Sequence, residues 1–252
     1  MSTMNQKNYE LIEKSNIKTG VVVNQTKIDS RSVINNSILW INSKTKGLSK
    51  SRNIAIQNSK AEICVFGDDD LEYIENYEKI IEREFEDLKI DIVCFQVEGI
   101  EKKFKNYKPE PKKIGFIDAL QVSSVEIAFR RSSIITKNLK FDELFGAGST
   151  FSMGEENIFL YDALRANLKI KYVPVKIANL HMSESSWFKG FNEEYLINRG
   201  AIFRRMSKRY YILLIIQFAL RKRKLFQDLN FFEITFKMLS GSNKYNKMSR
   251  NN

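Results

Sequence analysis

The polar and hydrophobic positions of this chain form two kinds of pattern, short apolar runs and longer amphipathic segments. The apolar runs are rich in β-branched residues and predict strands at residues 20–24, 37–41, 62–67, 91–97, 125–130 and 170–177. Apolar side chains at helical spacing predict helices at residues 49–59, 72–88, 155–168 and 210–220. Strands that alternate with helices indicate an α/β fold, with an open, mostly parallel, twisted sheet flanked by helices.

Three local features refine this prediction. Ser49 is in position to cap the helix that begins there. The run 62–67 shows no alternation of apolar and polar residues, as expected for a strand with both faces covered. Pro174 lies inside the strand predicted at residues 170–177, so we expect this strand at an edge of the sheet.

Three further segments are expected to be irregular or short. The charged segment 101–113 and the glycine- and serine-rich segment 145–154 are predicted to be loops, the second of them flexible. Residues 2–6 (STMNQ) follow Met1 directly, so the first strand of the sheet is expected to be truncated. A chain extended upstream by about eight to ten residues is expected to be more stable, because a missing central strand leaves backbone groups unpaired.

The composition is that of a globular protein with a packed core. Hydrophobic residues make up 43% of the 252 residues and proline occurs only 3 times, which argues against a disordered chain. The length suits one large α/β domain, or one domain with an appendage. Residues 1–16 are polar, so no secretory signal is expected. Cys64 and Cys94 lie inside predicted strands and are expected to be buried free thiols in a reducing cytoplasm.

The positive charge is concentrated near the C-terminal end. The net charge of the chain is +11, and residues 200–252 hold 12 Lys and Arg against 2 Asp and Glu. Residues 1–199 are therefore nearly neutral, with a net charge of +1. This distribution indicates a basic docking tail rather than a basic binding face on the core, and we expect no nucleic acid as a partner.

Residues 210–220 are apolar on almost every side of the predicted helix, with cations at 204–209 and 221–224 on either side. The segment is shorter than the roughly 18 residues that span a bilayer. Two compatible interpretations remain open. The segment lies on an anionic lipid surface, or it packs on the core with its basic ends in solvent.

Candidate chemistry is concentrated in the segment from Gly47 to Asp70. A glycine turn, a short helix that carries Arg52, and a strand lead to three consecutive aspartates, residues 68–70. Carboxylates at the carboxyl end of a strand lie where open α/β sheets bind their ligands. Adjacent acids repel one another and need a cation or water, and a divalent cation brings phosphates with it. The segment therefore predicts a site for a metal ion and a nucleotide diphosphate.

A second acidic pair, Glu155 and Glu156, follows Gly154 at the start of a predicted helix. The pair is either catalytic or only favours the helix N-terminus electrostatically. The helix terminus is expected to lower the pKa of these carboxylates and so keep them ionised. His181 is the only histidine and follows a predicted strand, where it is either structural or a ligand.

Three segments together resemble family 2 glycosyltransferases, whose fold is called GT-A. The segment LSKSRNIAIQNSKAEICVFGDDD resembles the donor half of that family, and FGAGSTFSMGEENIFL resembles its acceptor-side Gly-Glu-Asp segment. The later HMSESSWFKGF resembles the stretch after the last core strand in bacterial polysaccharide enzymes. The resemblance covers roughly residues 2–200. It implies a Rossmann-like GT-A domain at 1–185, with a nucleotide-sugar half (1–97) and an acceptor half (98–185), before a basic helical extension at 186–252.

The resemblance implies a donor site around the aspartates. Asp68 and Asp70 match the family's Asp-x-Asp element, in which one carboxylate holds ribose or a metal-bound water and the other holds Mn²⁺ or Mg²⁺ on the donor diphosphate. Asp69 lies between them and is expected to point into the structure. Arg52 matches the family's Arg-Asn position, where it would contact the nucleotide or orient Asp68, unless it is a surface arginine. The other positions expected to contact the donor are Thr3, Gln25 and Gly47.

The resemblance also implies a catalytic base. Glu156 matches the residue that takes the proton of an acceptor hydroxyl in a single displacement, which inverts the anomeric centre. The family's base is usually aspartate, and because glutamate is one methylene longer, Glu155 is the alternative. His181 stands where the family places a metal or diphosphate contact. Trp187 either stacks on an acceptor sugar or anchors the C-terminal segment.

The resulting prediction is an inverting, metal-dependent glycosyltransferase of bacterial capsule or surface polysaccharide synthesis. Its donor is expected to be a UDP-sugar and its acceptor a lipid-linked saccharide or oligosaccharide. The protein is expected in the cytoplasm, peripheral at the inner face of the plasma membrane, and a homodimer is compatible with the sequence. Two alternatives remain. A sugar nucleotidyltransferase would normally carry a glycine- and basic-rich loop near its start, and a non-catalytic membrane or nucleic-acid adaptor would not need clustered carboxylates.

Overall fold

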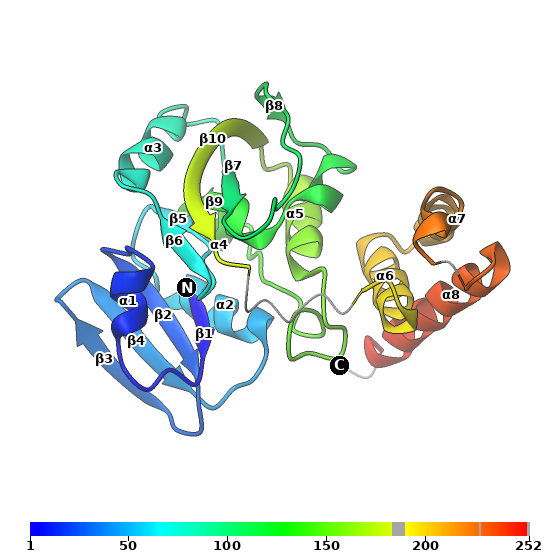
Figure 1. Cartoon of the computed structure of the whole chain (residues 1–252), viewed down its shortest axis with the longest axis horizontal. Helices are drawn as coiled ribbons and strands as arrows, with labels where there is room; N and C mark the ends of the chain where they lie inside the picture. The colour runs from blue at the N-terminus through cyan, green and yellow to red at the C-terminus, as the bar shows by residue number, and fades with distance from the viewer. Residues whose placement is uncertain (183–189, 227, 251–252) are drawn as a thin grey trace.

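The computed structural model describes residues 1–182, 190–226 and 228–250. The strands and the helices between them form one body, and the C-terminal helices form a second group beside it (Figure 1). Two sheets build the body, and the acidic segment lies where they meet.

The first sheet is formed by the N-terminal part of the chain. Its strands follow the order β1 (Ser2–Met4), β2 (Gly20–Gln25), β4 (Ile38–Ser43) and β3 (Ser30–Ile34). β1, β2 and β4 run parallel, whereas β3 is antiparallel to β4. The sheet therefore does contain a first strand, although β1 is only 3 residues long. Two helices accompany this sheet, α1 (Glu10–Lys14) and α2 (Leu48–Asn58).

The second sheet follows the order β5 (Ile63–Val65), β9 (Ile127–Arg130), β7 (Ile92–Gly99), β10 (Ile170–Leu180) and β6 (Leu71–Tyr73), with β8 (Lys112–Lys113) also paired to β10. Only β7 and β10 pair in parallel among its described strands, and the other pairs are antiparallel. The α/β class with flanking helices is confirmed. The pairing is more mixed than expected, because the short strands β6, β8 and β9 run against their neighbours.

A single bridge joins the two sheets. Ser2 pairs in parallel with Asp68, and the Ser2 amide donates a hydrogen bond of 2.9 Å to the carbonyl of Gly67. The segment that follows β5 thus continues alongside β1. This pairing places the first aspartate of the acidic run in the middle of the combined sheet.

Two expectations about strand position were wrong. The strand with Pro174, β10, lies between β7 and β6 instead of at an edge. Its register with β7 shifts between Tyr172 and Lys176, and this irregularity accommodates a residue that has no N–H to donate. Conversely, all three residues of β5 are only half-buried, although the run was expected to be covered on both faces.

The helix predicted at residues 72–88 is shorter than expected. Residues 71–73 form β6, which pairs antiparallel with residues 178–180 of β10, and helix α3 begins only at Tyr77 and ends at Glu84. The pairing of β6 with a distant strand overrides the local helical spacing. The remaining elements of this body are α4 (Arg131–Thr136), α5 (Glu155–Arg165) and short 3₁₀ turns at Asp118–Gln121 and Ser124–Glu126.

The N-terminus of α2 also differs from the prediction. Its first residue is Leu48 and its N-cap is Gly47, with φ of 116°, a conformation that favours glycine. Ser49 therefore lies inside the helix and does not cap it. Its hydroxyl instead donates a hydrogen bond of 2.6 Å to the carbonyl of Phe145 in the loop before α5.

The C-terminal extension is helical, as predicted. It consists of α6 (Glu193–Met206), α7 (Tyr211–Lys222), a 3₁₀ turn (Arg223–Leu225) and α8 (Phe231–Met248). These helices share one apolar core with Phe145, Phe151 and Ile158 of the body. The loop 145–154 lacks helix and strand as expected, but its two phenylalanines are fully buried in this core.

Two further observations concern the cysteines and the lengths of the helices. Cys64 is half-buried, Cys94 is buried, and both are free thiols. Across the described ranges, none of the helices combines the length and the apolar character that a bilayer crossing requires.

Candidate active site

Arg52 of α2 holds the two acidic segments together. Its guanidinium donates to the Glu155 carboxylate at 2.8 Å and to both carboxylate oxygens of Asp68 at 2.9 and 3.0 Å. A further hydrogen bond of 2.8 Å reaches the hydroxyl of Ser124. Only 3% of the Arg52 side chain is exposed. The surface alternative for Arg52 is therefore excluded, and the donor-side and acceptor-side acids meet at one cation.

Aromatic rings enclose this cation. The guanidinium carbon of Arg52 lies 5.9 Å from the centre of the Phe66 ring and 5.5 Å from that of Phe141. The attraction of Asp68 and Glu155 outweighs burial and raises the pKa of Arg52 above its ordinary value. Arg52 is thus a permanently charged residue that fixes the positions of both carboxylates.

The three consecutive aspartates have three different environments. Asp68 is bound to Arg52. Asp69 accepts a hydrogen bond of 2.6 Å from the Thr3 hydroxyl, which itself accepts one of 3.1 Å from Gln6. Asp70 has one buried carboxylate oxygen that finds no hydrogen-bond partner in the described part of the chain. Burial, and then the charges of Asp68 and Asp69, raise the pKa of Asp70 to about 6.

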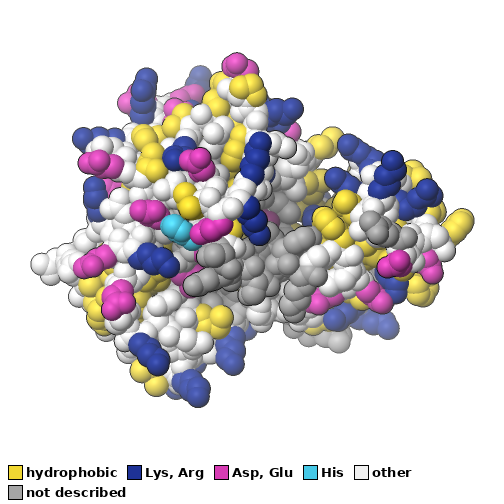
Figure 2. All heavy atoms as spheres, in the orientation of Figure 1, with side chains coloured by type: hydrophobic (Ala, Val, Ile, Leu, Met, Phe, Trp, Pro, Cys, Tyr) yellow, Lys and Arg dark blue, Asp and Glu magenta, His cyan; other side chains and the backbone are white. Residues whose placement is uncertain are grey.

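His181 lies next to Asp70, as the sequence led us to expect for a shared site. Its backbone amide donates a hydrogen bond of 2.9 Å to the Asp70 carbonyl. The ring nitrogens lie 3.4 Å from Glu72 and 3.5 Å from Glu101. In Figure 2 the histidine, in cyan, is flanked by acidic side chains on an exposed face. Glu72 and Glu101 were missed from the sequence, because no local pattern distinguishes them from solvated glutamates.

No three His, Cys, Asp or Glu side chains converge as a ready-made metal site among the described residues. The residues nevertheless fit a cation that arrives with a diphosphate, since Mg²⁺ is usually held by one or two carboxylates plus substrate phosphates. The observation that supports this fit is the unpartnered, buried oxygen of Asp70. Asp68, by contrast, already has both oxygens bound to Arg52.

The two glutamates at the start of α5 have different roles in the fold. Glu155 is buried and bound to Arg52. Glu156 is half-buried and forms no ion pair with any described residue. Burial, and then the neighbouring Glu155, raise the pKa of Glu156 above its ordinary value. The expectation that the helix terminus would lower this pKa was wrong, because desolvation outweighs the terminus.

Gln25 and Gly47 meet at the end of β2. The Gly47 amide donates a hydrogen bond of 2.7 Å to the side-chain oxygen of Gln25. A Cβ on Gly47 would lie 3.1 Å from the Ser149 hydroxyl, so the glycine brings α2 close to the loop before α5. Gln25 is the last residue of β2, which pairs with the strand of Thr3, and Gly47 is the N-cap of α2. Trp187 lies outside the described residues.

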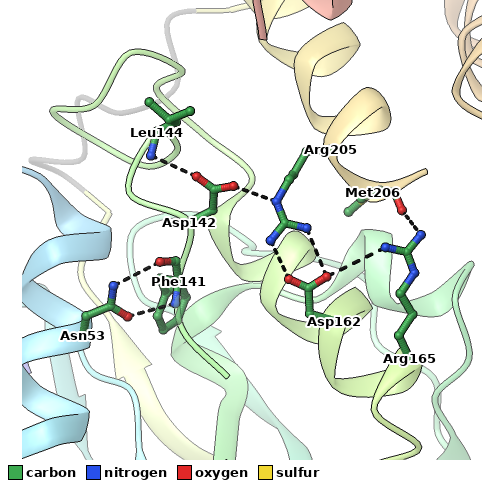
Figure 3. A network of polar contacts seen from close by, with 8 residues as sticks. All are labelled: Asn53, Phe141, Asp142, Leu144, Asp162, Arg165, Arg205 and Met206. Carbon is green, nitrogen blue, oxygen red and sulfur yellow. Dashed lines mark hydrogen bonds and ion pairs between the residues drawn. The ribbon is translucent and has the colours of Figure 1, made fainter. Parts of the chain in front are cut away.

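A polar network ties the loop before α5 to its surroundings (Figure 3). Asn53 exchanges two hydrogen bonds with the backbone of Phe141, at 2.8 and 3.0 Å. Arg205 of α6 binds Asp142 at 2.6 Å and Asp162 of α5 at 2.7 Å. The role of Arg205 was missed, because only the fold brings α6 to this loop.

A cavity of about 850 Å³ borders this site, because Arg52 and Gly67 are among the residues that line it. It is lined by the first residues of β2, by Ser37 before β4, and by apolar side chains of α3 such as Ile81. None of the acids at residues 68–70 and 155–156 lines it. Arg52 therefore connects this cavity to the acids, which do not themselves line it.

Comparison with known proteins identifies the family. Residues 27–159, more than half of the chain, match the model described as Glycosyl transferase family 2. The chain belongs to glycosyl transferase family 2. This membership makes it a glycosyltransferase and favours the transferase over the nucleotidyltransferase and adaptor alternatives. The matched range includes Arg52, the three aspartates and both glutamates.

Solved structures agree with the GT-A fold of this family 2 member. A crystal structure of S. aureus TarS 1–349 has a TM-score of 0.60 and 13% identity, and it covers 89% of this chain and 73% of TarS 1–349. The same protein in complex with UDP-GlcNAc has a TM-score of 0.61 and 13% identity, with 87% and 75% covered. No curated protein sequence matches the chain. At this identity the likeness establishes the fold alone.

Proposed function

We propose that this protein transfers a sugar from a UDP-sugar to a saccharide hydroxyl with inversion, assisted by a divalent cation. The observation that carries the proposal is that only one of the two adjacent glutamates forms an ion pair. Glu155 forms an ion pair with Arg52, whereas Glu156, the next residue, forms no ion pair with a described residue. A carboxylate that is not committed to an ion pair is able to serve as a general base.

The donor would bind where the ends of β1, β2 and β5 meet. Thr3, Gln25 and Gly47 gather there, and Asp68 and Asp69 follow β5 directly. Carboxylate and amide groups at a strand edge suit the ribose and base of a nucleotide. The choice of uridine is supported by the structural likeness to TarS, which was crystallised with UDP-GlcNAc and with UDP.

Asp70 is the residue best suited to hold the cation, Mn²⁺ or Mg²⁺. Its buried oxygen has no partner in the described structure, and burial together with the charges of Asp68 and Asp69 raises its pKa. Asp68 and His181 were also expected as metal ligands. Asp68 is held by Arg52, and the ring of His181 lies between Glu72 and Glu101. We propose that Asp68 and His181 hold Asp70 and the neighbouring side chains in position and do not bind the cation themselves. When bound, the cation would neutralise charge on the departing diphosphate.

Glu156 would act as the general base. The acceptor oxygen attacks the anomeric carbon, the proton of that hydroxyl passes to the Glu156 carboxylate, and UDP leaves with the electron pair of the broken bond. One displacement of this kind inverts the anomeric centre. The raised pKa of Glu156 makes its ionised form a stronger proton acceptor than an ordinary glutamate.

The acceptor would be a lipid-linked saccharide or oligosaccharide of a bacterial capsule or surface polysaccharide. The reaction would then take place at the cytoplasmic face of the plasma membrane, where such acceptors are built. The GT-A domain would span residues 1–185, with donor and acceptor halves divided near residue 97, and the extension would span 186–252. The position of α6 against the loop before α5 supports a role of the extension at the acceptor side.

The experiment that tests the proposal is release of UDP from UDP-sugars with Mn²⁺, with and without saccharide acceptors. We expect turnover by the wild type and a large loss for Asp70→Ala and Glu156→Gln. Glu75→Gln is the matched control, because Glu75 is an exposed glutamate close to the acidic segment in sequence. Unchanged turnover in both site variants would contradict the proposal. Product stereochemistry, determined by NMR, tests inversion separately.

A further inference from the structure

Helix α7 presents an apolar surface to the outside of the protein. Its inner side is buried against α6 and α8 through Ile215 and Ala219. Its outer side carries four exposed aliphatic residues, of which Leu213 is 63% and Leu220 66% exposed. The other two are Ile212 and Ile216. Packing on the core, one of the two interpretations of this segment, therefore accounts for only one side of the helix.

The exposed residues form one continuous stripe. Ile212, Ile216 and Leu220 are spaced by four residues, and Leu213 is three residues before Ile216, so all four lie on the same face of the helix. A stripe this wide, opposite a buried face, is unusual for a helix that is solvated on its outer side. It indicates a surface that is covered by something apolar.

Exposed cations stand at both ends of the stripe. They are Lys208, Arg209, Arg221, Lys222, Arg223 and Lys224. None of the six forms an ion pair with a carboxylate of the described chain, and the sequence from 208 to 224 contains no acidic residue. Figure 2 shows Lys and Arg side chains gathered with hydrophobic ones on the lobe formed by the C-terminal helices.

The charge distribution selects the occupant of this surface. A second copy of the chain, paired through α7 in antiparallel orientation, would bring the cations at 208–209 of each copy against those at 221–224 of the other. An anionic bilayer instead offers an apolar layer for the stripe and negative headgroups for both basic ends. At 12 residues α7 is about 18 Å long, which is too short to span the bilayer but suits a helix that lies in its plane.

We infer that α7 docks the protein on an anionic membrane surface, with Ile212, Leu213, Ile216 and Leu220 inserted at the boundary between headgroups and acyl chains. Residues 208–209 and 221–224 would contact the phosphate groups of the lipids. Docking through α7 does not depend on the transfer reaction, because the surface lies outside the acidic site. It would hold that site near acceptors that are anchored in the same membrane.

The test is co-sedimentation of the full chain with vesicles. We expect binding to vesicles of roughly one part phosphatidylglycerol to three parts phosphatidylcholine, and little binding to phosphatidylcholine alone. Leu213→Ser/Leu220→Ser should weaken binding to the anionic vesicles at least about tenfold, since it removes inserted apolar area. Replacing all four cations at 221–224 by Gln should weaken binding similarly and reduce its dependence on salt.

The matched control is Leu88→Ser/Ile117→Ser, in which two side chains of the body that are 81% and 76% exposed receive the same change. Its binding should equal that of the wild type, and equal Tm values should show that all variants are folded. Absence of wild-type binding, equal binding to both vesicle types, or wild-type binding by the α7 variant would overturn the inference. A wild-type dimer that Leu213→Ser/Leu220→Ser converts to a monomer, without lipid binding, would assign the surface to a second copy.

Discussion

Arg52 determines which acidic side chains remain available for chemistry. By binding Asp68 and Glu155 it neutralises one acid from each segment, and burial raises the pKa of one other acid in each segment, Asp70 and Glu156. Titratable groups with perturbed pKa values are frequent at functional sites, where a buried charge often has no permanent ion-pair partner to offset the loss of solvation. The two adjacent glutamates therefore differ in their partners, and under the proposed function they differ in their roles.

Exchange of each glutamate for glutamine should separate these roles. Glu156→Gln should lower kcat by about 10²- to 10⁴-fold, because an amide cannot take the acceptor proton, and it should raise Tm at neutral pH, because folding disfavours the ionised carboxylate. Glu155→Gln should cost about 1–3 kcal/mol of unfolding free energy, because it weakens a buried ion pair with Arg52. Turnover assays and thermal melts on both variants measure the difference. If Glu156→Gln were fully active and Glu155→Gln were stable but inactive, Glu155 would be the base and Glu156 would not.

Asp70 should make stability depend on pH in the absence of metal and nucleotide. Its pKa is about 6 in the folded protein against a reference value of 3.8, so ionisation is disfavoured by folding. The wild type should therefore lose stability as pH rises through this interval, and Asp70→Asn should not. After discounting for partial exposure, we expect Asp70→Asn to be more stable by about 1 kcal/mol above pH 6, or about 2–4 °C in Tm. Melts at pH 4 should coincide, and a constant difference at all pH values would refute the explanation.

Among the elements, the close contact of α6 and α8 depends on two glycines. A Cβ on Gly200 would clash with the backbone carbonyl of Met238, and one on Gly241 would clash with that of Ile197. Neither glycine has a positive φ, so what these positions require is the lack of a side chain and not an unusual backbone conformation. The two helices enclose the core that also contains Phe145 and Phe151. The glycines thus affect the loop before the active-site glutamates through packing.

Gly200→Ala should push α6 away from α8. We expect a loss of about 3 kcal/mol, typical of overpacking against backbone that cannot give way, which corresponds to a fall in Tm of about 6–12 °C. Gly115→Ala is the control, since its added Cβ would meet only Asp118 at 3.9 Å, and it should change stability by less than about 0.5 kcal/mol. Equal melting curves for the two variants would show that the helices are free to separate.

In the molecule as a whole, the C-terminal helices are part of the glycosyltransferase body rather than an attached tail. Arg205 binds Asp142 of the loop and Asp162 of α5 (Figure 3). A Cβ on Gly154, directly before Glu155, would clash with the side chain of Ile202 in α6. The extension therefore contacts the segment that carries the proposed base. These contacts argue against independent folding of the parts on either side of the boundary predicted near residue 185, which lies outside the described residues.

A chain that ends at residue 185 should consequently fail to fold cooperatively. It would expose Phe145, Phe151 and Ile158, which are fully buried, and leave Asp142 and Asp162 without Arg205. We expect aggregation or a melt without a sharp transition, measured by light scattering and circular dichroism. Adding residues 186–252 as a separate polypeptide should restore solubility if packing is the cause. A soluble truncated chain with an unchanged Tm would show instead that the body is stable without these helices.

Local chemistry along the chain was enough to predict the strands β2, β4, β7 and β9, helices α2 and α5, and the acidic segments. Periodicity, glycine turns and runs of carboxylates depend on neighbours a few residues apart. The same information predicted that the helix at residues 72–88 begins at residue 72 and that β10 lies at an edge, and both of these predictions were wrong. Strand pairing joins residues more than a hundred positions apart, such as Leu71 and Leu180. The order of apolar and polar residues around either position does not indicate this pairing.

The family resemblance and the apolar segment at 210–220 could likewise be read from the chain. Only the tertiary structure shows that Glu155 forms an ion pair and Glu156 does not, because the partner of Glu155 is Arg52, 103 residues earlier in the chain. Folding was also needed to show that one side of α7 is buried and the other exposed. Sequence patterns indicate which groups are capable of chemistry or insertion. Which of those groups are left without a partner depends on long-range contacts, and these form only when the whole chain packs.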